Sequence, residues 1–293
     1  MNYYNEITEQ LINNEITKIV KDYSKNKSDL NTYYEVGKLL SEAGKHYGEG
    51  IIKEYSKKLS IELNKQYSCT TLKYYRLFYN FSKRHPVGDE LSFSHYRVLF
   101  TIKDERKINY YMNQAIKRNL SKRELEKIVK NNEYERLPIE TRNKIIKDED
   151  DKVTDLIKNP ILISNKYYHE IISEKVLQKL ILEDIPSFLE ELGEGFTFIK
   201  NEYKIKIGDR YNYVDLLLYN INYNCYVVIE LKVCELKKEH IGQIETYMTY
   251  IDKNLKRIDQ DKTIGIIITR RDNKYLIEYC SDKRIISREY EII

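Results

Sequence analysis

Three charged residues stand in two apolar, β-prone stretches of the C-terminal half. Asp215 lies just inside the run VDLLLY, and Glu230 and Lys232 lie at the end of the run YVVIELKV. Burying an unpaired charge is strongly unfavourable, so charges in such surroundings need a reason. Glu230 and Lys232 are two residues apart, and on a strand their side chains project from the same face. We therefore expect these three residues to act together.

A hairpin would bring the two carboxylates together. If the strands pair around a turn at residues 220–224, Asp215 and Glu230 lie at similar heights and repel each other unless a cation sits between them. Oxygen ligands without Cys or His favour Mg²⁺ or Mn²⁺. A metal lowers the pKa of a bound water and stabilises charge on a phosphate, while Lys232 orients or deprotonates the water or neutralises the scissile phosphate. The alternative is a buried salt-bridge network without catalysis, which rarely offsets its own desolvation.

The surrounding sequence predicts a mixed sheet flanked by helices. Its core element order is α-β-β-β-α-β, and one further strand follows. Helices are expected over 170–192, interrupted near Pro186, and over 238–252, and strands are expected over 196–207, 211–219, 226–233, 263–269 and 275–280. Gly208 and Asp209 are expected to form a turn. The two charged stretches are then neighbouring strands between two helices.

The D-(x)n-E-x-K string on adjacent strands resembles the PD-(D/E)xK nuclease superfamily. The next helix carries Gln243-Ile244-Glu245-Thr246-Tyr247, which is similar to the Q-h-x-x-Y element of the RecB-like branch. The superfamily's proline is absent, because Val214 precedes Asp215. The resemblance implies a restriction-endonuclease-like core, with Gln243 and Tyr247 approaching the scissile strand. Ordinary packing of these two side chains is the alternative.

Longer stretches resemble the YhcG-like family of PD-(D/E)xK nucleases over about residues 30–293. They are YYEVGKLLSE, LKYYRLFY, LSFSHYRVLF, SKRELEKIV, FLEELGEGFTFIKNEYKIKIGDRYNYVDLLLYN, CYVVIELKV and IGQIETYMTYID. The resemblance implies an α+β protein of two domains: an all-helical N-terminal domain and a restriction-endonuclease-like α/β core.

The resemblance also implies roles for individual residues. Asp215, Glu230 and the main-chain carbonyl of Leu231 would bind the metal, and Lys232 would be the catalytic lysine. Glu191 matches the helix acid that some superfamily members use as an outer metal contact. Glu194 is an alternative to Glu191, and a plain solvent-facing role for Glu191 is another.

Charge is unevenly distributed along the chain. Residues 51–137 contain 19 Lys and Arg against 10 Asp and Glu, whereas residues 151–293 contain 22 against 24. A basic region joined to a nearly neutral one predicts that the first half contacts a polyanion. The alternative is a solvated basic surface.

The basic region has the outline of a helix-turn-helix. Helices are expected over 31–42, 51–64 and 70–84, with Ser68 or Thr70 as a cap after the polar turn KQYSC. A short turn between helices carrying basic and aromatic side chains is typical of DNA readers, although a plain helical bundle has the same pattern. In the DNA-binding interpretation Lys73, Arg76, Lys83 and Arg84 contact phosphates.

A second unit over residues 91–130 resembles the ParB-type helix-turn-helix segment. The resemblance rests on Ser94-His95 and on the run from Ser121 to Leu125, where Ser121 and Glu124 also fit a capping box. Arg97 and Arg123 are the substrate-contacting residues expected from this unit. His95 is expected to be structural or to contact phosphate, because no partner for a catalytic base is evident nearby.

The boundary between the domains is expected near residue 150. Two prolines, Pro138 and Pro160, bracket a charged stretch that contains the acidic run 148–151. We therefore expect a nucleic-acid-binding domain over 1–150 and a nuclease domain over 151–293.

The composition also indicates the class of protein and its cellular compartment. The four cysteines form no C-x-x-C pair, which fits reduced thiols in a cytoplasmic protein, and neither a signal peptide nor a membrane span is evident. The resemblance to the YhcG-like family implies a bacterial source. The expected function is a Mg²⁺- or Mn²⁺-dependent nuclease acting on DNA. The type of family that the chain resembles suggests a role in phage defence or mobile-element biology. Alternatives are an inactive nucleic-acid-binding adapter and an RNA-directed nuclease. By superfamily analogy we expect a homodimer, and an activating protein partner is a further expectation.

Overall fold

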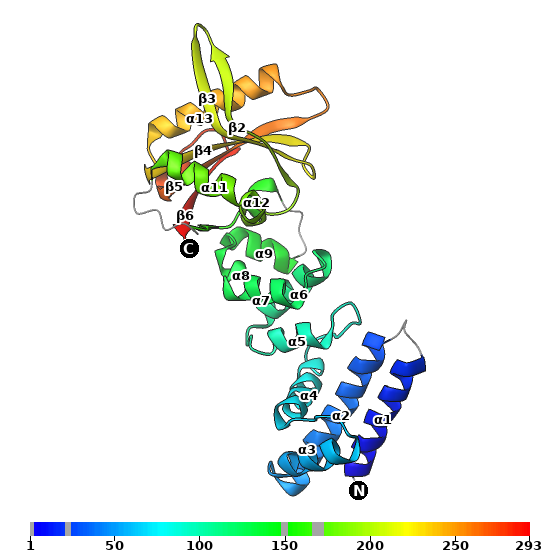
Figure 1. Ribbon diagram of the computed structural model, residues 1–293. Coiled ribbons are helices and arrows are strands. Elements are labelled where there is room, and N and C mark those ends of the chain that lie inside the picture. Colours follow the sequence, from blue (N-terminus) through cyan, green and yellow to red (C-terminus); the bar gives the residue numbers. More distant parts are fainter. Residues whose placement is uncertain (1–2, 21–24, 148–151, 166–172) are drawn as a thin grey trace. The chain divides into compact units, whose positions relative to one another are not determined.

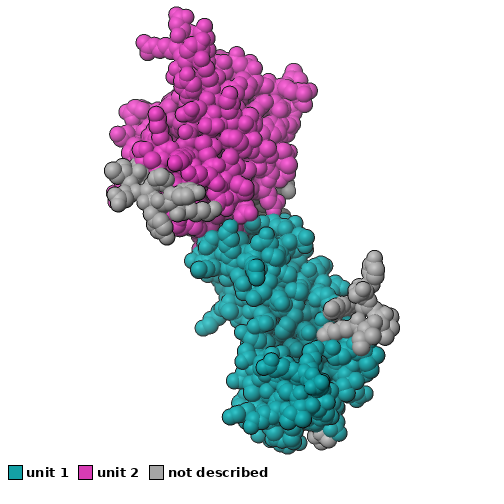
Figure 2. Space-filling view, viewed as in Figure 1, with its two compact units in different colours: residues 1–132 teal, residues 133–293 magenta. Residues whose placement is uncertain are grey.

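The computed structural model describes residues 3–20, 25–147, 152–165 and 173–293. The chain forms two compact units, residues 1–132 and 133–293, shown in different colours in Figure 2. This division falls before the boundary near residue 150 expected from the sequence. The acidic run 148–151, on which that expectation rested, lies outside the described residues.

The described part of unit 1 is helical. Its helices are α1 (Tyr3–Val20), α2 (Lys25–Tyr47), α3 (Ile51–Glu62), α4 (Cys69–Ser82), α5 (Phe93–Leu99), α6 (Glu105–Lys117) and α7 (Lys122–Lys130). Leu40, Leu59 and Leu72 are fully buried in a core shared by α2, α3 and α4. Gly37 lets α2 approach α4 closely, because a Cβ there would lie 2.1 Å from the carbonyl oxygen of Tyr75.

Local caps start several of these helices. The Ser68 hydroxyl accepts a hydrogen bond from the Thr71 amide at 3.1 Å, so Ser68 caps α4. The capping box is confirmed: the Ser121 amide donates to Glu124 at 2.7 Å, and the Glu124 amide donates to the Ser121 hydroxyl at 3.4 Å. The helix that contains Ser94 and His95 begins at Phe93, after the N-cap residue Ser92. Its Ser92 amide donates to His95 Nδ1 at 3.1 Å, so His95 has a structural role there.

Unit 2 contains a six-stranded mixed sheet of order β1-β6-β5-β4-β3-β2. The strands are β1 (Ile161–Ile163), β2 (Phe196–Ile207), β3 (Arg210–Asn220), β4 (Cys225–Glu235), β5 (Asp261–Arg271) and β6 (Ile285–Ile292). Strands β2, β3 and β4 pair antiparallel, whereas β4, β5, β6 and β1 pair parallel. The expected mixed sheet is confirmed.

Helices cover both faces of this sheet (Figure 1). On one face α11 (Glu174–Glu183) and α12 (Ile185–Leu192) bury Leu177, Leu180 and Phe188 against it. On the other face α13 (Lys238–Asn254) buries Ile244 and Met248, beside the short α14 (Lys274–Glu278). Strands covered on both faces are apolar almost throughout, as in β4 and β5.

Three expectations about unit 2 were wrong. The segment Tyr275 to Cys280 is not a strand, because Asn273 caps α14 there by accepting from the Leu276 amide. Strands β1 and β6 were missed, since one has three residues and the other is largely polar. The helical stretch before β2 is broken at Asp184 rather than Pro186. Asp184 caps α12, and the proline occupies the first turn, where it is tolerated.

Short helices precede β1 and belong to unit 2. They are α8 (Glu133–Arg136), α9 (Ile139–Lys147) and α10 (Val153–Leu156). The Arg136 guanidinium donates to the Pro160 carbonyl at 3.0 Å, and Lys158 pairs with Glu133 at 3.0 Å. These buried contacts explain why the compact unit begins at residue 133. No helix among the described residues has the length and apolarity needed to cross a bilayer.

Candidate functional site

Asp215 and Glu230 come together through the pairing of β3 and β4. The register pairs Leu216 with Ile229, so the next step along the strands places Asp215 opposite Glu230. The Leu231 amide donates to Asp215 Oδ2 at 2.7 Å. The hairpin thus brings together the two carboxylates singled out in the sequence.

Three side chains surround the Glu230 carboxylate. Lys232 Nζ and Gln243 Nε2 each donate to Glu230 Oε1 at 2.7 Å. Gln243 Nε2 also donates to the Tyr247 hydroxyl at 3.0 Å. Glu230 is 2% exposed, Lys232 9% and Tyr247 5%. Tyr247, expected to contact substrate, therefore has its ring in the core and its hydroxyl against Gln243.

The second oxygen of Glu230 is unusual. Oε2 is buried and has no hydrogen-bond partner among the residues that the structure describes. Burial, followed by the charge of Asp215, raises the pKa of Glu230 to about 7. Burial also raises the pKa of Asp215. Burial is the largest single influence on the pKa of Lys232 and lowers it, but the hydrogen bond to Glu230 and the charges of the nearby carboxylates together raise the lysine pKa. A site with excess negative charge and an unpartnered oxygen suits a cation.

The carboxylates of Asp215 and Glu230 are the groups that could bind a metal ion here. The described residues contain no group of three or more His, Cys, Asp and Glu side chains placed to hold a metal ion. Asp215 and Glu230 supply two carboxylates, and the unpartnered Oε2 of Glu230 is available as a ligand. Mg²⁺ typically binds through one or two carboxylates and keeps several waters, so two carboxylates fit this ion.

A further acid, missed in the sequence, lies beside this group. Glu174 opens α11, and its Oε2 lies 3.7 Å from Lys232 Nζ with the side chain 47% exposed. On the same helix, Gln178 Nε2 donates to the Asp215 carbonyl at 3.1 Å. The only sequence signal was Ser173-Glu174 at a helix start, where an acid is also favoured by the helix dipole.

The described contacts of Glu191 are with Arg136, Lys158 and β1, and none is with Asp215 or Glu230. The Glu191 carboxylate is bound by the Arg136 guanidinium, and it accepts from the Leu162 amide at 3.0 Å. The alternative, Glu194, is exposed, and its main-chain carbonyl accepts from Asn220 at the far end of β3 from Asp215. Five residues of strand separate these points, or about 16 Å. Neither acid joins the Asp215–Glu230 pair.

The basic residues predicted in unit 1 differ in their surroundings. Lys73 and Arg123 are exposed. Arg76 instead forms a bidentate pair with Glu49, with N–O distances of 2.7 and 3.0 Å. The exposed Arg97 stacks over the Tyr74 ring at 4.2 Å. Lys83 lies over the Tyr79 ring at 4.0 Å, and Arg84 is exposed.

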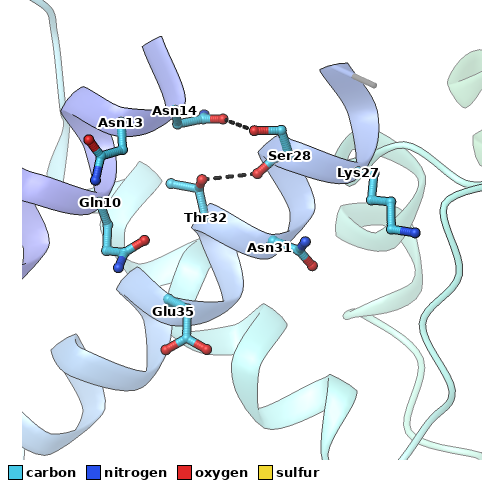
Figure 3. Close-up of a pocket in the computed structure, with 8 residues that line it drawn as sticks. All are labelled: Gln10, Asn13, Asn14, Lys27, Ser28, Asn31, Thr32 and Glu35. Atoms are coloured by element: carbon cyan, nitrogen blue, oxygen red, sulfur yellow. Dashed lines mark hydrogen bonds between the residues drawn. The ribbon is translucent and has the colours of Figure 1, made fainter. Parts of the chain in front are cut away.

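Unit 1 also contains a polar hollow between α1 and α2 (Figure 3). Its volume is about 360 Å³. The Ser28 hydroxyl donates to Asn14 at 2.8 Å, and the Thr32 hydroxyl donates to the Ser28 carbonyl at 2.9 Å. None of the residues predicted to bind substrate or metal lines it, so it is separate from the chemistry at Glu230.

Two domain families match the chain. Residues 7–136 match the DUF1016 N-terminal domain, and residues 154–292 match the YhcG PDDEXK nuclease domain. A curated relative, "Putative nuclease YhcG" of Escherichia coli (strain K12), is 22% identical over 282 residues, which cover 81% of this chain and 75% of that protein.

Solved structures with partial similarity include a repair endonuclease from Pyrococcus abyssi. It is 20% identical and has a TM-score of 0.29, over 43% of this chain and 48% of that one. A structure described as an EndoMS–dsDNA2 complex is 24% identical with a TM-score of 0.29, over 44% and 48% of the two chains. This chain thus spans less than half the length of either. From the two matching domains, the chain belongs to the YhcG-like family of PD-(D/E)xK nucleases.

Proposed function

We propose that this protein is a metal-dependent nuclease that hydrolyses phosphodiester bonds in DNA. The observation that carries the proposal is the closeness of Asp215 to Glu230, just beyond the last paired residues of β3 and β4, together with the buried Oε2 of Glu230, which has no partner among the described residues. Two opposed carboxylates with raised pKa values are unfavourable by themselves and become favourable around a cation. The matching nuclease domain supports the same activity.

Asp215, Glu230 and the main-chain carbonyl of Leu231 would hold Mg²⁺ or Mn²⁺. The metal supplies a bound water of lowered pKa and charge stabilisation at the phosphate. Lys232 has a raised pKa and therefore stays protonated near neutral pH. Its ammonium acts as a hydrogen-bond donor and positive charge, orienting the water or neutralising the scissile phosphate, and not as the base.

Gln243 and Tyr247 are assigned to positioning. Gln243 bridges the Glu230 carboxylate and the Tyr247 hydroxyl. The buried ring of Tyr247 fixes the end of this chain of hydrogen bonds. Glu174, on the solvent side of Lys232, is the accessory acid in place of Glu191.

The helical region over residues 1–150 is proposed to bind DNA. Its basic stretch has a net charge of +9 over residues 51–137, and Lys73, Arg97 and Arg123 are exposed. Binding through phosphates would be strongly salt-dependent. Dimerisation is proposed by analogy with other nucleases of the superfamily. A role in phage defence or mobile-element biology is proposed from the type of family.

Cleavage by purified protein tests this function. Supercoiled plasmid, linear duplex, single-stranded DNA and RNA are incubated with Mg²⁺, Mn²⁺ or EDTA. We expect metal-dependent cutting of DNA by the wild type and none by Glu230→Ala or Lys232→Ala.

Matched controls come from the same part of the chain. Glu235→Ala and Lys238→Ala remove an exposed acid and an exposed lysine at the end of β4 and the start of α13, and both should cut normally. Metal-dependent cutting of RNA alone would reassign the substrate. Absence of cutting with retained duplex binding would favour a binding adapter.

A further inference from the structure

The outer part of the β2–β3 hairpin forms an arm over residues 199–213. It extends beyond the helices of unit 2 in Figure 1, as the yellow-green hairpin. Its strands pair Lys204 with Tyr213 and Lys206 with Tyr211, and the turn at Gly208 and Asp209 closes it. Residues paired directly across two strands share a face, so these four side chains lie together.

This face of the arm is open to solvent. Ile205 is 1% exposed and packs into the core on the α13 side, so the alternation of a strand places Lys204 and Lys206 on the opposite face. Tyr211 is 56% exposed and Tyr213 is 52% exposed. Lys204 Nζ lies 3.7 Å from the centre of the Tyr211 ring, and Lys206 Nζ lies 6.0 Å from it.

The two ammonium groups lie near an aromatic ring and, in the described part of the chain, pair with no acid. A neutral tyrosine ring does not neutralise a lysine, and no carboxylate among the described residues pairs with either Lys204 or Lys206. The arm has four basic residues against two acids, a net charge of +2. The remainder of residues 151–293 has a net charge of −4. Positive charge is therefore concentrated on the arm.

The arm continues directly into the candidate site. Tyr213 and Tyr211 precede Asp215 by two and four residues on β3, which corresponds to about 7 and 13 Å of strand. Lys204 and Lys206 are likewise about 7 Å apart along β2, roughly twice the 3.4 Å rise per phosphate of one DNA strand. Both lysines can thus follow a single phosphate backbone.

The geometry points to a second DNA contact: the face formed by Lys204, Lys206, Tyr211 and Tyr213 binds the phosphate backbone of duplex DNA beside the bond held at Asp215 and Glu230. This inference rests on the proposed nuclease function. The lysines supply the charge complementarity, and the exposed rings supply stacking surface for sugars or an unpaired base. The arm thereby places the duplex on the nuclease unit itself.

The test measures binding of a labelled linear duplex to the full chain in EDTA, over a range of salt concentrations. Each lost phosphate contact lowers the slope of log affinity against log salt by about 0.9. Lys204→Ala with Lys206→Ala should therefore reduce the slope by about 1.8. Lys204→Arg with Lys206→Arg should retain it, because the charge is kept.

The matched control is Lys262→Ala with Lys283→Ala. These exposed lysines lie where β5 and β6 begin, at the other end of the sheet, and the charge change is identical. An unchanged slope in the arm variant, or an equal change in the control, overturns the inference while leaving the proposed function intact. A wild type that neither binds nor cuts DNA overturns both.

Discussion

Lys232 donates a hydrogen bond to one oxygen of the Glu230 carboxylate, at 2.7 Å, while the other oxygen is buried without a partner in the described part of the chain. The two residues lie two positions apart on β4, so this contact is set within a single strand. One ammonium does not satisfy two carboxylates, and Asp215 lies opposite Glu230. In the metal-free protein a proton on Glu230 relieves the repulsion between the two carboxylates, and a bound cation would do the same.

The stability of the metal-free protein should depend on Glu230. Its pKa is about 7 in the folded protein against an ordinary value of 4.5, so the folded state binds this proton more tightly than the unfolded state. The resulting stabilisation is present below pH 4.5 and is lost as the pH rises through 7. It is on the order of 3 kcal/mol. Urea unfolding in EDTA should show wild type losing stability relative to Glu230→Gln across this window. If the free energy of unfolding changed with pH in the same way in wild type and in Glu230→Gln, the prediction would be wrong.

Lys232→Ala should separate metal binding from catalysis. The proposed metal ligands remain in this variant, whereas the positive charge proposed for the phosphate or water is lost. We expect cleavage to fall by at least about 100-fold, with Mn²⁺ still bound at pH 8. Calorimetric titration with Mn²⁺ and a cleavage assay on the same sample measure both effects. Loss of Mn²⁺ binding together with activity would argue against this division of roles.

Glu174→Gln should affect activity without affecting stability. The side chain is 47% exposed, and its contact with Lys232 is long, at 3.7 Å. Substitutions at such sites usually change stability by less than about 0.5 kcal/mol. Removing an accessory acid beside a metal site typically lowers activity or metal affinity by about 10-fold. Cleavage rates and thermal unfolding, measured beside the exposed Glu183→Gln on the same helix, test this assignment.

Glu191→Gln should lower stability without affecting metal binding. It removes the negative charge that faces the Arg136 guanidinium, whose side chain is 9% exposed. Breaking a buried pair in this way costs about 3–5 kcal/mol. Denaturant unfolding should show this loss, while the exposed Glu194→Gln should be neutral. Mn²⁺ affinity of the folded variant should stay at the wild-type value, and a selective loss of that affinity would restore Glu191 to the metal site.

In unit 1, Lys73 should matter more for DNA binding than Arg76. Lys73 is exposed on α4, whereas Arg76 is held by both oxygens of Glu49. Lys73→Ala should lower the salt slope of duplex binding by about 0.9. Arg76→Ala should leave that slope unchanged, because its charge is already paired. Fluorescence anisotropy over a salt series distinguishes the two, and an equal loss would show that DNA displaces Glu49.

Local sequence determined much of this structure. The alternation and turn residues of 196–233 specify a three-stranded meander, which by itself sets Asp215 against Glu230. Likewise, the spacing of Ser121 and Glu124 specifies the start of α7. These features rest on contacts between residues that are close in sequence or joined by a short turn, and such contacts leave a readable pattern.

Long-range contacts decided the rest. Strands β1 and β6 exist because β1 pairs in parallel with β6 and β6 pairs in parallel with β5, and neither sequence has a strand pattern strong enough to show this alone. Glu174 reaches Lys232, and Glu191 is held by Arg136, because of how α11, α12 and α8 pack in unit 2. The sequence by itself determined the Asp-Glu-Lys group, since it depends on one hairpin. Only the tertiary structure decided which helix acid joins that group, since this depends on packing between segments far apart in the chain.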